Sequence, residues 1–399
     1  MKIVEINGGV FGSTGRIMFG IADALTQAGH EALCFSPVTT TNRDREPDHD
    51  YFRIGSFRSR QINVLAERIT GRQGQFAYFA TAKMLKRIAE FSPDVIHLHT
   101  LHSGFIHLPL LFEYIKKNRT KTVWTLHDCW AFTGHCPHYV SVGCEKWKTE
   151  CDGCPLYRDY PKTLFDTSKK MHRLKKKWFL GVEDMTLATP SEWLKRQAEA
   201  SFLSAYPVKV VHNGVDLSQF RPVTTDIAQK ISCDGRHIVL GVAFGWGEKK
   251  GLDVFCSLAK RLDESYRIVL VGTDEAVESM LPDNVIPIRR TADIAELSEI
   301  YSAADVLVNP TREDTFPTVN IEALACGTPV LTFRTGGSPE IIDETCGAVV
   351  EKDDIEALVS EIERICTTSP YSADACMRRA MNFDRKKMLN RYVDLITGG

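Results

Sequence analysis

Short apolar runs alternate with amphipathic segments along almost all of the 399 residues. Apolar runs bounded by glycine or polar residues are typical of strands buried on both faces of a parallel sheet. One group of predicted strands is 4–6, 95–98, 122–126, 186–188 and 208–211, and a second is 238–242, 267–271, 306–309, 330–332 and 348–350. Helices are predicted between them, for example at 15–28, 251–262 and 292–302. The alternation predicts an α/β protein whose parallel sheets carry helices on both faces.

A chain of this length is expected to form two domains. Residues 204–222 contain two prolines and the turn His212-Asn213-Gly214-Val215-Asp216, after which a new strand–helix series starts. We therefore predict a first domain at 1–207 and a second at 208–383. Each is expected to be a doubly wound, Rossmann-like domain, with the two facing each other across a cleft. Ligands of such sheets bind at the carboxyl ends of the strands.

Composition narrows the class of protein. The formal net charge of −2 gives no reason to expect a nucleic-acid partner. No apolar run approaches the roughly 20 residues that span a bilayer. The N-terminus leads from Met1 directly into a predicted strand, without a signal-peptide pattern. We therefore expect a cytoplasmic protein with reduced thiols.

The most informative segment is 310–330, which is predicted as a strand end, an acidic loop, a helix and a further strand. Asp314 and Glu322 lie eight residues apart in it, one in the loop and one on the helix. An ionised carboxylate accepts several hydrogen bonds and can take two adjacent hydroxyls, as ribose and hexoses present them. The alternative is a helix start made acidic by the helix dipole.

Two motifs of the predicted first domain lie directly after strands. Gly8 and Gly9 follow the first strand, where glycine either lets the backbone approach a ligand or makes a tight turn. His127 follows the strand at 122–126. A histidine there can donate to a sugar hydroxyl or balance developing charge, although an isolated histidine is usually structural.

Two motifs of the predicted second domain suit a phosphate group. Lys249 and Lys250 precede the helix that opens at Gly251, and a lysine there can face a diphosphate or simply be exposed. Gly336 and Gly337 join a strand to a helix, and their free amides can receive phosphate oxygens.

The order of these motifs resembles the retaining nucleotide-sugar glycosyltransferases of family 4, over nearly the whole chain. The resemblance implies the GT-B architecture of two Rossmann-like domains: an acceptor-side domain first, a donor domain second, and a terminal helix at 384–399 packed back on the first domain. Glu322 would hold the ribose, Asp314 or Glu313 would touch the transferred sugar, and Lys250 would neutralise the leaving diphosphate. His127 would lie beside the donor sugar, with Gly8 and Gly9 bordering the diphosphate and the acceptor.

Two departures from the family pattern affect these roles. The family usually has an arginine some six residues before Lys250, and the chain has none there. Lys249 is a substitute, but its ammonium is a point charge and lacks the bidentate geometry of a guanidinium. The acidic loop also carries both Glu313 and Asp314, and its spacing to Glu322 favours Asp314.

The predicted function is a retaining hexosyltransferase that moves a hexose from a UDP- or GDP-sugar to a glycan acceptor in bacterial surface polysaccharide synthesis, and the acceptor is expected to be lipid-linked. No catalytic metal is expected, because the second domain lacks a D-x-D motif at a strand end. The alternatives are a nucleotide-sugar epimerase of the same architecture and a non-catalytic nucleotide-sugar binding protein, which the missing arginine favours.

The segment 129–154 is rich in cysteine. Cys136, Cys144, Cys151 and Cys154 include a C-x-x-C pair, and four thiolates in a loop suit a structural zinc ion. Free thiols and an iron–sulfur cluster are the alternatives. The insert resembles that of bacterial enzymes that build exopolysaccharide, colanic acid, capsule or O-antigen.

Residues 169–179 form a basic segment with helical periodicity. Met171, Leu174 and Trp178 share one face, and the charges take the other. Such a helix either attaches to anionic lipid at the inner face of the plasma membrane or packs on the first domain as a solvated amphipathic helix.

Overall fold

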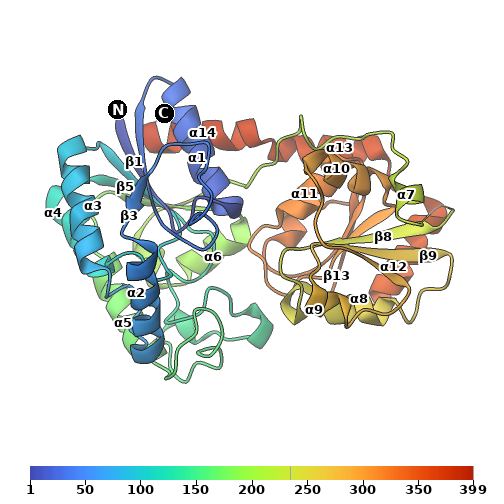
Figure 1. The fold of residues 1–399 in the computed structure, drawn as a ribbon, viewed down its shortest axis with the longest axis horizontal. Helices are drawn as coiled ribbons and strands as arrows, with labels where there is room; N and C mark the ends of the chain where they lie inside the picture. The colour runs from blue at the N-terminus through green and yellow to red at the C-terminus, as the bar shows by residue number, and fades with distance from the viewer. Residues whose placement is uncertain (234, 399) are drawn as a thin grey trace. The chain divides into compact units, whose positions relative to one another are not determined.

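The structure is a computed structural model that describes residues 1–233 and 235–398. The chain divides into two compact units. Unit 1 comprises Met1–Val211 together with the residues from Leu389 onward, and unit 2 comprises His212–Met388. Within each unit, helices cover a central sheet, as Figure 1 shows.

Unit 1 contains a seven-stranded sheet in which every strand pairs in parallel with its neighbours, in the order β3-β2-β1-β4-β5-β6-β7. Its strands are β1 (Lys2–Ile6), β2 (Glu31–Pro37), β3 (Phe52–Ile54), β4 (Val95–Leu98), β5 (Lys121–Thr125), β6 (Met185–Thr189) and β7 (Val208–Val210). Its helices are α1 (Gly12–Gln27), α2 (Phe57–Thr70), α3 (Tyr78–Phe91), α4 (Leu108–Asn118), α5 (Ser168–Phe179) and α6 (Glu192–Glu199). The strand order reverses between β1 and β4, so the carboxyl ends of these two strands mark the ligand position of a doubly wound sheet.

Unit 2 contains a six-stranded parallel sheet in the order β10-β9-β8-β11-β12-β13. Its strands are β8 (His237–Val242), β9 (Tyr266–Val271), β10 (Val285–Ile288), β11 (Val306–Asn309), β12 (Val330–Phe333) and β13 (Gly347–Val350). Its helices are α7 (Ile227–Lys230), α8 (Leu252–Leu258), α9 (Glu275–Glu278), α10 (Ile294–Ala303), α11 (Thr318–Ala325), α12 (Ile355–Thr368) and α13 (Ala373–Ala380). Here the order reverses between β8 and β11.

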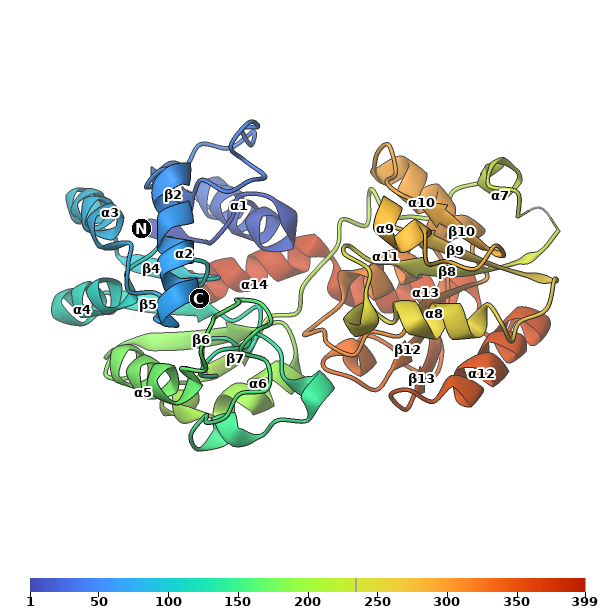
Figure 2. The same cartoon turned by 60° about the horizontal axis from the view of Figure 1, so that its bottom comes forward.

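Alternate residues of the second sheet belong to two separate apolar cores. Leu240 and Leu307 pack with α10 and α11, whereas Val239 and Val308 pack with α8 and α12. Accordingly, α10 and α8 lie on opposite sides of β8 and β9 in both Figure 1 and Figure 2. Burial on both faces explains why these strands are continuous apolar runs.

The predicted α/β class and parallel sheets are confirmed, and every predicted strand is present. The pattern did not reveal β2, β3 or β10. β2 begins with exposed Glu31, β3 has three residues, and β10 contains Pro287. β3 and β10 were missed because they are edge strands, and an edge strand tolerates proline and needs fewer apolar residues.

The last helix, α14 (Arg385–Thr397), begins in unit 2 and continues into unit 1. In unit 1, Tyr392 and Ile396 are fully buried, the Tyr392 ring lies 5.7 Å from that of His97, and Lys121 Nζ donates to the Ile396 carbonyl at 3.0 Å. Within residues 1–233 and 235–398, no helix has the length and apolarity that a membrane span requires.

Candidate functional site

The glycine loop of unit 1 is held by one buried side chain. Asn7 Oδ1 accepts hydrogen bonds from the amides of Gly8 and Thr100, at 2.9 and 3.3 Å, and its Nδ2 donates to the Gly9 carbonyl at 2.8 Å. A Cβ added to Gly8 would lie 3.1 Å from the Thr100 carbonyl oxygen. The loop after β1 is thereby tied to the segment after β4, at the point where the strand order reverses.

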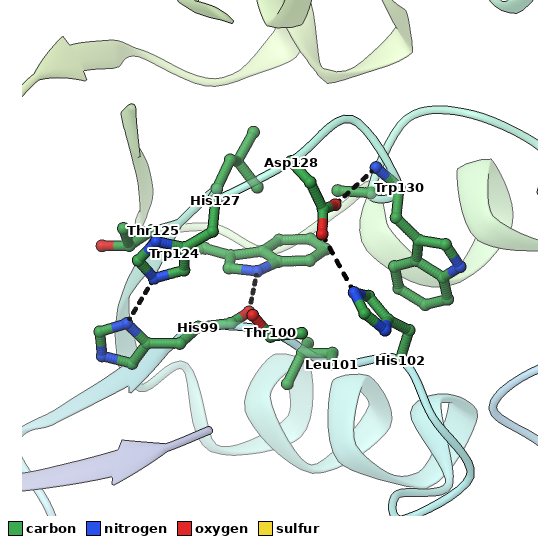
Figure 3. A pocket seen from close by; sticks show the side chains of 11 residues that line it. His99, Thr100, Leu101, His102, Trp124, Thr125, His127, Asp128 and Trp130 are labelled. Atoms are coloured by element: carbon green, nitrogen blue, oxygen red, sulfur yellow. Dashed lines mark hydrogen bonds and ion pairs between the residues drawn. The ribbon is translucent and has the colours of Figure 1, made fainter. Parts of the chain in front are cut away.

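His127 lies directly after β5, half-buried, in a hollow of about 220 Å³ counting its opening to solvent. Figure 3 shows the side chains that line this hollow, which come from the carboxyl ends of β4 and β5. His127 Nε2 lies 3.0 Å from His99 Nδ1. Burial and the neighbouring His99 together lower the pKa of His127 to about 3, so the imidazole is neutral at physiological pH.

Asp128 is the charged group of this hollow. Its carboxylate accepts from His102 Nε2 at 3.0 Å and from the Trp130 amide at 2.8 Å (Figure 3). Burial alone would raise the pKa of Asp128, but the His102 imidazole and these hydrogen bonds bring it to about 2. The hollow therefore offers one fixed negative charge beside neutral histidine, a polar environment suited to hydroxyl groups.

Sequence reasoning missed His99 and His102. His97 and His99 alternate along the end of β4, and His102 follows three residues later. The strand-end rule that selected His127 applies equally to them, because β4 and β5 are neighbours in the sheet.

In unit 2, Lys250 and Asp314 meet although 64 residues separate them. Lys250 Nζ lies 2.7 Å from Asp314 Oδ2, and the two side chains are 31% and 21% exposed. Lys250 follows β8 and Asp314 follows β11, so the pair lies beyond the two strands where the order reverses. Asp314 is further fixed by the Phe316 amide, which donates to its Oδ1 at 3.1 Å.

In the neighbouring ion pair of Lys249 and Glu313, the glutamate side chain is buried and the lysine side chain is exposed. Lys249 Nζ lies 3.0 Å from Glu313 Oε2, and the Glu313 side chain is only 2% exposed. Asp314 is thus the more accessible of the two carboxylates between which the sequence left a choice.

The Gly336–Gly337 turn packs directly on the acidic loop. Gly336 has φ +54°, and a Cβ there would lie 1.7 Å from the Asp314 carbonyl oxygen. The Gly337 amide faces the same carbonyl at 3.4 Å. The segment that follows is a single 3₁₀ turn at Ser338–Glu340, where a full helix was predicted.

Glu322 lies on α11, the helix that directly follows the acidic loop, and is partly exposed. Its Oε2 accepts a hydrogen bond from the hydroxyl of buried Tyr301 at 2.9 Å. Burial raises the pKa of Tyr301, and the Glu322 charge raises it further, so this phenol remains a donor.

The arginine that the family pattern places before Lys250 is absent, and the nearby Arg312 is already engaged. Its guanidinium donates to Asp253 twice at 2.8 Å and to Asp353 at 2.7 Å. Arg312 therefore anchors the acidic loop to α8.

The four predicted zinc ligands line one hollow of about 280 Å³ counting its opening, namely Cys136, Cys144, Cys151 and Cys154. None of them forms a disulfide. However, among the described residues the group whose ligand atoms all lie within 4.8 Å is Glu5, His97 and His99, and not the cysteines. Among the described residues the four thiols thus do not form a closed metal site, and the zinc ion stays a prediction.

The basic segment forms α5, and one of its cations is not at the surface. Lys175 is fully buried, and its Nζ donates to the carbonyls of Trp130 and Thr133 at 2.7 and 3.0 Å. It also lies 3.5 Å from the centre of the Trp130 ring. The prediction that the charges of this helix are all exposed is wrong at this position, because the cysteine-rich segment packs over Lys175.

Two family models match the chain. The model described as Glycosyltransferase Family 4 matches residues 14–219, more than half of the chain, and the model described as Glycosyl transferases group 1 matches 236–368.

Among curated relatives, the putative colanic acid biosynthesis glycosyl transferase WcaC of Escherichia coli K12 is 24% identical over 318 residues, 76% of each chain. The GDP-mannose-dependent alpha-mannosyltransferase of Mycobacterium tuberculosis is 29% identical over 336 residues, covering 81% of this chain and 75% of its own.

Solved structures share the fold over the whole chain. Sucrose-phosphate synthase from Thermosynechococcus elongatus has a TM-score of 0.73 at 18% identity, covering 100% of this chain and 98% of its own. Anabaena HepE in complex with UDP-glucose has a TM-score of 0.67 at 15% identity, covering 100% of both. The predicted GT-B fold is confirmed, and nothing in these similarities supports the epimerase alternative. The chain belongs to glycosyltransferase family 4, and it is a glycosyltransferase.

Proposed function

We propose that the protein is a retaining glycosyltransferase that moves a hexose from a nucleotide diphosphate sugar to a glycan acceptor in bacterial surface polysaccharide synthesis. The observation that carries the proposal is the Lys250–Asp314 pair, which lies beyond β8 and β11 with the Gly336–Gly337 turn packed against it. Relatives named for colanic acid synthesis and for GDP-mannose, and a fold neighbour bound to UDP-glucose, support the donor and acceptor classes.

We assign binding of the nucleotide-sugar donor to unit 2. Lys250 neutralises charge that grows on the leaving diphosphate, as a preorganised cation does in a partly buried site. Asp314 contacts hydroxyls of the transferred sugar, and Glu322 accepts from the ribose hydroxyls while Tyr301 orients it. The Lys249 ammonium and the amides of Gly336 and Gly337 are assigned to contacts with the diphosphate.

In unit 1 we assign His127, Gly8 and Gly9 to contacts with the sugar and the acceptor. In unit 2, Glu313 is the alternative to Asp314 for the contact with the transferred sugar. The sugar leaves through an oxocarbenium-like state as its bond to the diphosphate breaks, the acceptor hydroxyl attacks from the same face, and its proton passes to an oxygen of the leaving diphosphate. No step uses a metal ion.

The test is incubation with a panel of UDP- and GDP-sugars, with and without membrane glycolipid extract as acceptor. We expect one donor to raise the melting temperature, because a bound ligand stabilises the folded state, and to release nucleoside diphosphate when acceptor is present. Sugar interconversion without release of nucleoside diphosphate, or binding without turnover of any donor, would reject the transferase proposal.

We propose secondly that Cys136, Cys144, Cys151 and Cys154 hold a structural zinc ion. Their common hollow supports this, as does the Gly134 amide, which donates to Cys151 Sγ at 3.1 Å. Protein purified without chelator should carry about one zinc per chain, and Cys154→Ser should lose it whereas Cys256→Ser, on α8, should not. Metal-free protein with four titratable thiols in the segment would reject the site.

We propose thirdly a peripheral contact of α5 with anionic lipid, in keeping with a lipid-linked acceptor at the inner face of a cytoplasmic membrane. Lys170, Lys176 and Lys177 are exposed on α5 and support it. Reversal of these three charges should reduce sedimentation with anionic vesicles, whereas Lys260→Glu in unit 2 should not. Equal sedimentation of the triple variant and the wild type would exclude this contact.

A further inference from the structure

Five polar side chains form a continuous hydrogen-bonded row across three neighbouring strands of unit 1. Glu5 of β1 lies between two histidines: its Oε1 is 3.0 Å from His97 Nδ1, and its Oε2 is 2.8 Å from His99 Nε2. His99 Nδ1 is 3.0 Å from His127 Nε2, the contact drawn at the left of Figure 3. At the other end, His97 Nε2 is 2.8 Å from Thr125 Oγ1. Glu5, His97 and His99 are at most 1% exposed.

The charge of Glu5 sets the direction of these bonds. Burial alone would raise its pKa, but His97 and His99 lower it to about 2, so the carboxylate is ionised and can only accept. His97 Nδ1 and His99 Nε2 must therefore both carry a proton and donate it to Glu5.

The protonation of His99 then decides which ring donates in the hydrogen bond between His99 and His127. Burial and the neighbouring His97 lower the pKa of His99 to about 4 although the Glu5 carboxylate raises it, so the His99 ring is neutral. A neutral imidazole with its proton on Nε2 accepts at Nδ1. His127 must then donate from Nε2, which leaves its Nδ1 without a proton.

We propose that Glu5 and His99 are positioning residues that hold His127 as the Nε2–H tautomer, so that His127 Nδ1 accepts a hydrogen bond from a hydroxyl of the bound sugar or acceptor. This inference rests on the proposed function for the identity of the hydroxyl. It reverses the expectation that His127 donates to a sugar hydroxyl, because the only proton on the ring is directed at His99.

A carboxylate with two imidazoles also resembles a metal-ligand set, and their ligand atoms lie within 4.8 Å of one another. The nitrogen–oxygen distances of 2.8 and 3.0 Å are those of hydrogen bonds: His99 Nε2 faces Glu5 Oε2, and His97 Nδ1 lies 3.0 Å from both carboxylate oxygens. The geometry therefore favours a row of hydrogen bonds, in which an outer carboxylate fixes the tautomer of a histidine that reaches the ligand.

Long-range ¹H–¹⁵N spectra of the full chain labelled at histidine nitrogen report the tautomer of each ring. The His127 signals are assigned by their loss in His127→Gln. In the wild type at neutral pH we expect His127 with a protonated Nε2 and an unprotonated Nδ1. A protonated Nδ1 in the wild type would overturn the proposal without any further variant.

Glu5→Gln tests the cause. The amide replaces one acceptor oxygen by an NH₂ donor and removes the negative charge, so the two histidines are no longer both required to donate to residue 5, and the tautomer of His127 should become mixed or inverted. His99→Gln should act in the same way, and it serves if Glu5→Gln does not fold. Thr125→Val removes the far end of the row but leaves the link between Glu5 and His99, and should leave the His127 tautomer unchanged. An unchanged His127 spectrum in both Gln variants would overturn the proposal.

Kinetics test the consequence. Once a donor is found, Glu5→Gln should lower kcat by about 10- to 100-fold, the range typical when an outer partner of a functional histidine is removed, while the donor KM stays within about twofold. An altered tautomer with wild-type kcat would overturn the functional part. If no donor is turned over, the proposed function fails while the spectra still decide the tautomer.

Discussion

Removal of the Lys250 charge should slow sugar transfer without unfolding the protein. Two unit charges about 4 Å apart interact by about 4 kcal/mol at an effective dielectric constant of about 20. Asp314 already holds the ammonium at 2.7 Å, so part of this energy is given up when a diphosphate binds. We expect Lys250→Gln to raise the activation free energy by ~2–4 kcal/mol, a loss in kcat of about 30-fold to several hundredfold.

The stability of the same variant should change little. The side chains of Lys250 and Asp314 are 31% and 21% exposed, and partly solvated ion pairs contribute about 0–1 kcal/mol to the free energy of unfolding. Lys249→Gln should lower the stability of the protein, because its partner Glu313 is nearly inaccessible. We expect that variant to lose ~1–3 kcal/mol of unfolding free energy, less than for a fully buried pair because Lys249 itself is solvated.

The assay is release of nucleoside diphosphate in the presence of acceptor, run beside urea unfolding of each variant. Lys250→Arg, which keeps the charge, should recover part of kcat, and Lys260→Gln, at an exposed position of the same unit, is the control. If Lys250→Gln turned over within about threefold of the wild type, the assignment of Lys250 to the leaving group would be wrong.

Three further predictions concern Glu322, Gly336 and Glu67. Glu322→Gln keeps an acceptor for the Tyr301 hydroxyl but loses the charge, so we expect a folded protein with about tenfold weaker donor binding in thermal-shift titration; unchanged affinity would refute the ribose assignment. Gly336→Ala introduces a Cβ 1.7 Å from the Asp314 carbonyl oxygen, and we expect at least ~1–3 kcal/mol lower unfolding free energy together with lost activity, measured by urea unfolding and turnover. Burial raises the pKa of Glu67 to about 7, so its stabilising contribution, complete below about pH 4, is lost as pH rises through 7. Relative to Glu67→Gln, the wild type should therefore lose about 2 kcal/mol of unfolding free energy between pH 5 and pH 7, and parallel curves for the two proteins would contradict this.

Strand-end chemistry could be predicted because two patterns coincide there. A buried strand is a continuous apolar run, and the first polar or glycine residue after it lies at the ligand edge of the sheet. This indicated Gly8 and His127 as candidates from the sequence alone, whereas Lys250 was selected from the helix start at Gly251 and Asp314 from its spacing to Glu322.

The row from Glu5 to His99 could not be predicted in this way. Glu5, His97 and His99 lie within or beside β1 and β4, where polar residues interrupt an otherwise apolar pattern. Only the pairing of β1 with β4 places Glu5 opposite His97. A charged residue within a buried strand is the signal that would have indicated a partner on the next strand.

Lys175 shows the opposite limit. In the run Lys175-Lys176-Lys177 nothing distinguishes the first lysine from the others. Its burial depends on the carbonyl groups of Trp130 and Thr133, which a segment more than forty residues earlier in the chain supplies.

The dependence of unit 1 on α14 has a consequence for synthesis on the ribosome. Tyr392 and Ile396 are fully buried in unit 1, and Tyr392 packs against His97. The first unit to be translated is therefore the last to be completed, because residues of its core are translated after all of unit 2. A nascent chain stopped before Leu389 would hold an intact unit 2 beside a unit 1 that exposes the row leading to His127.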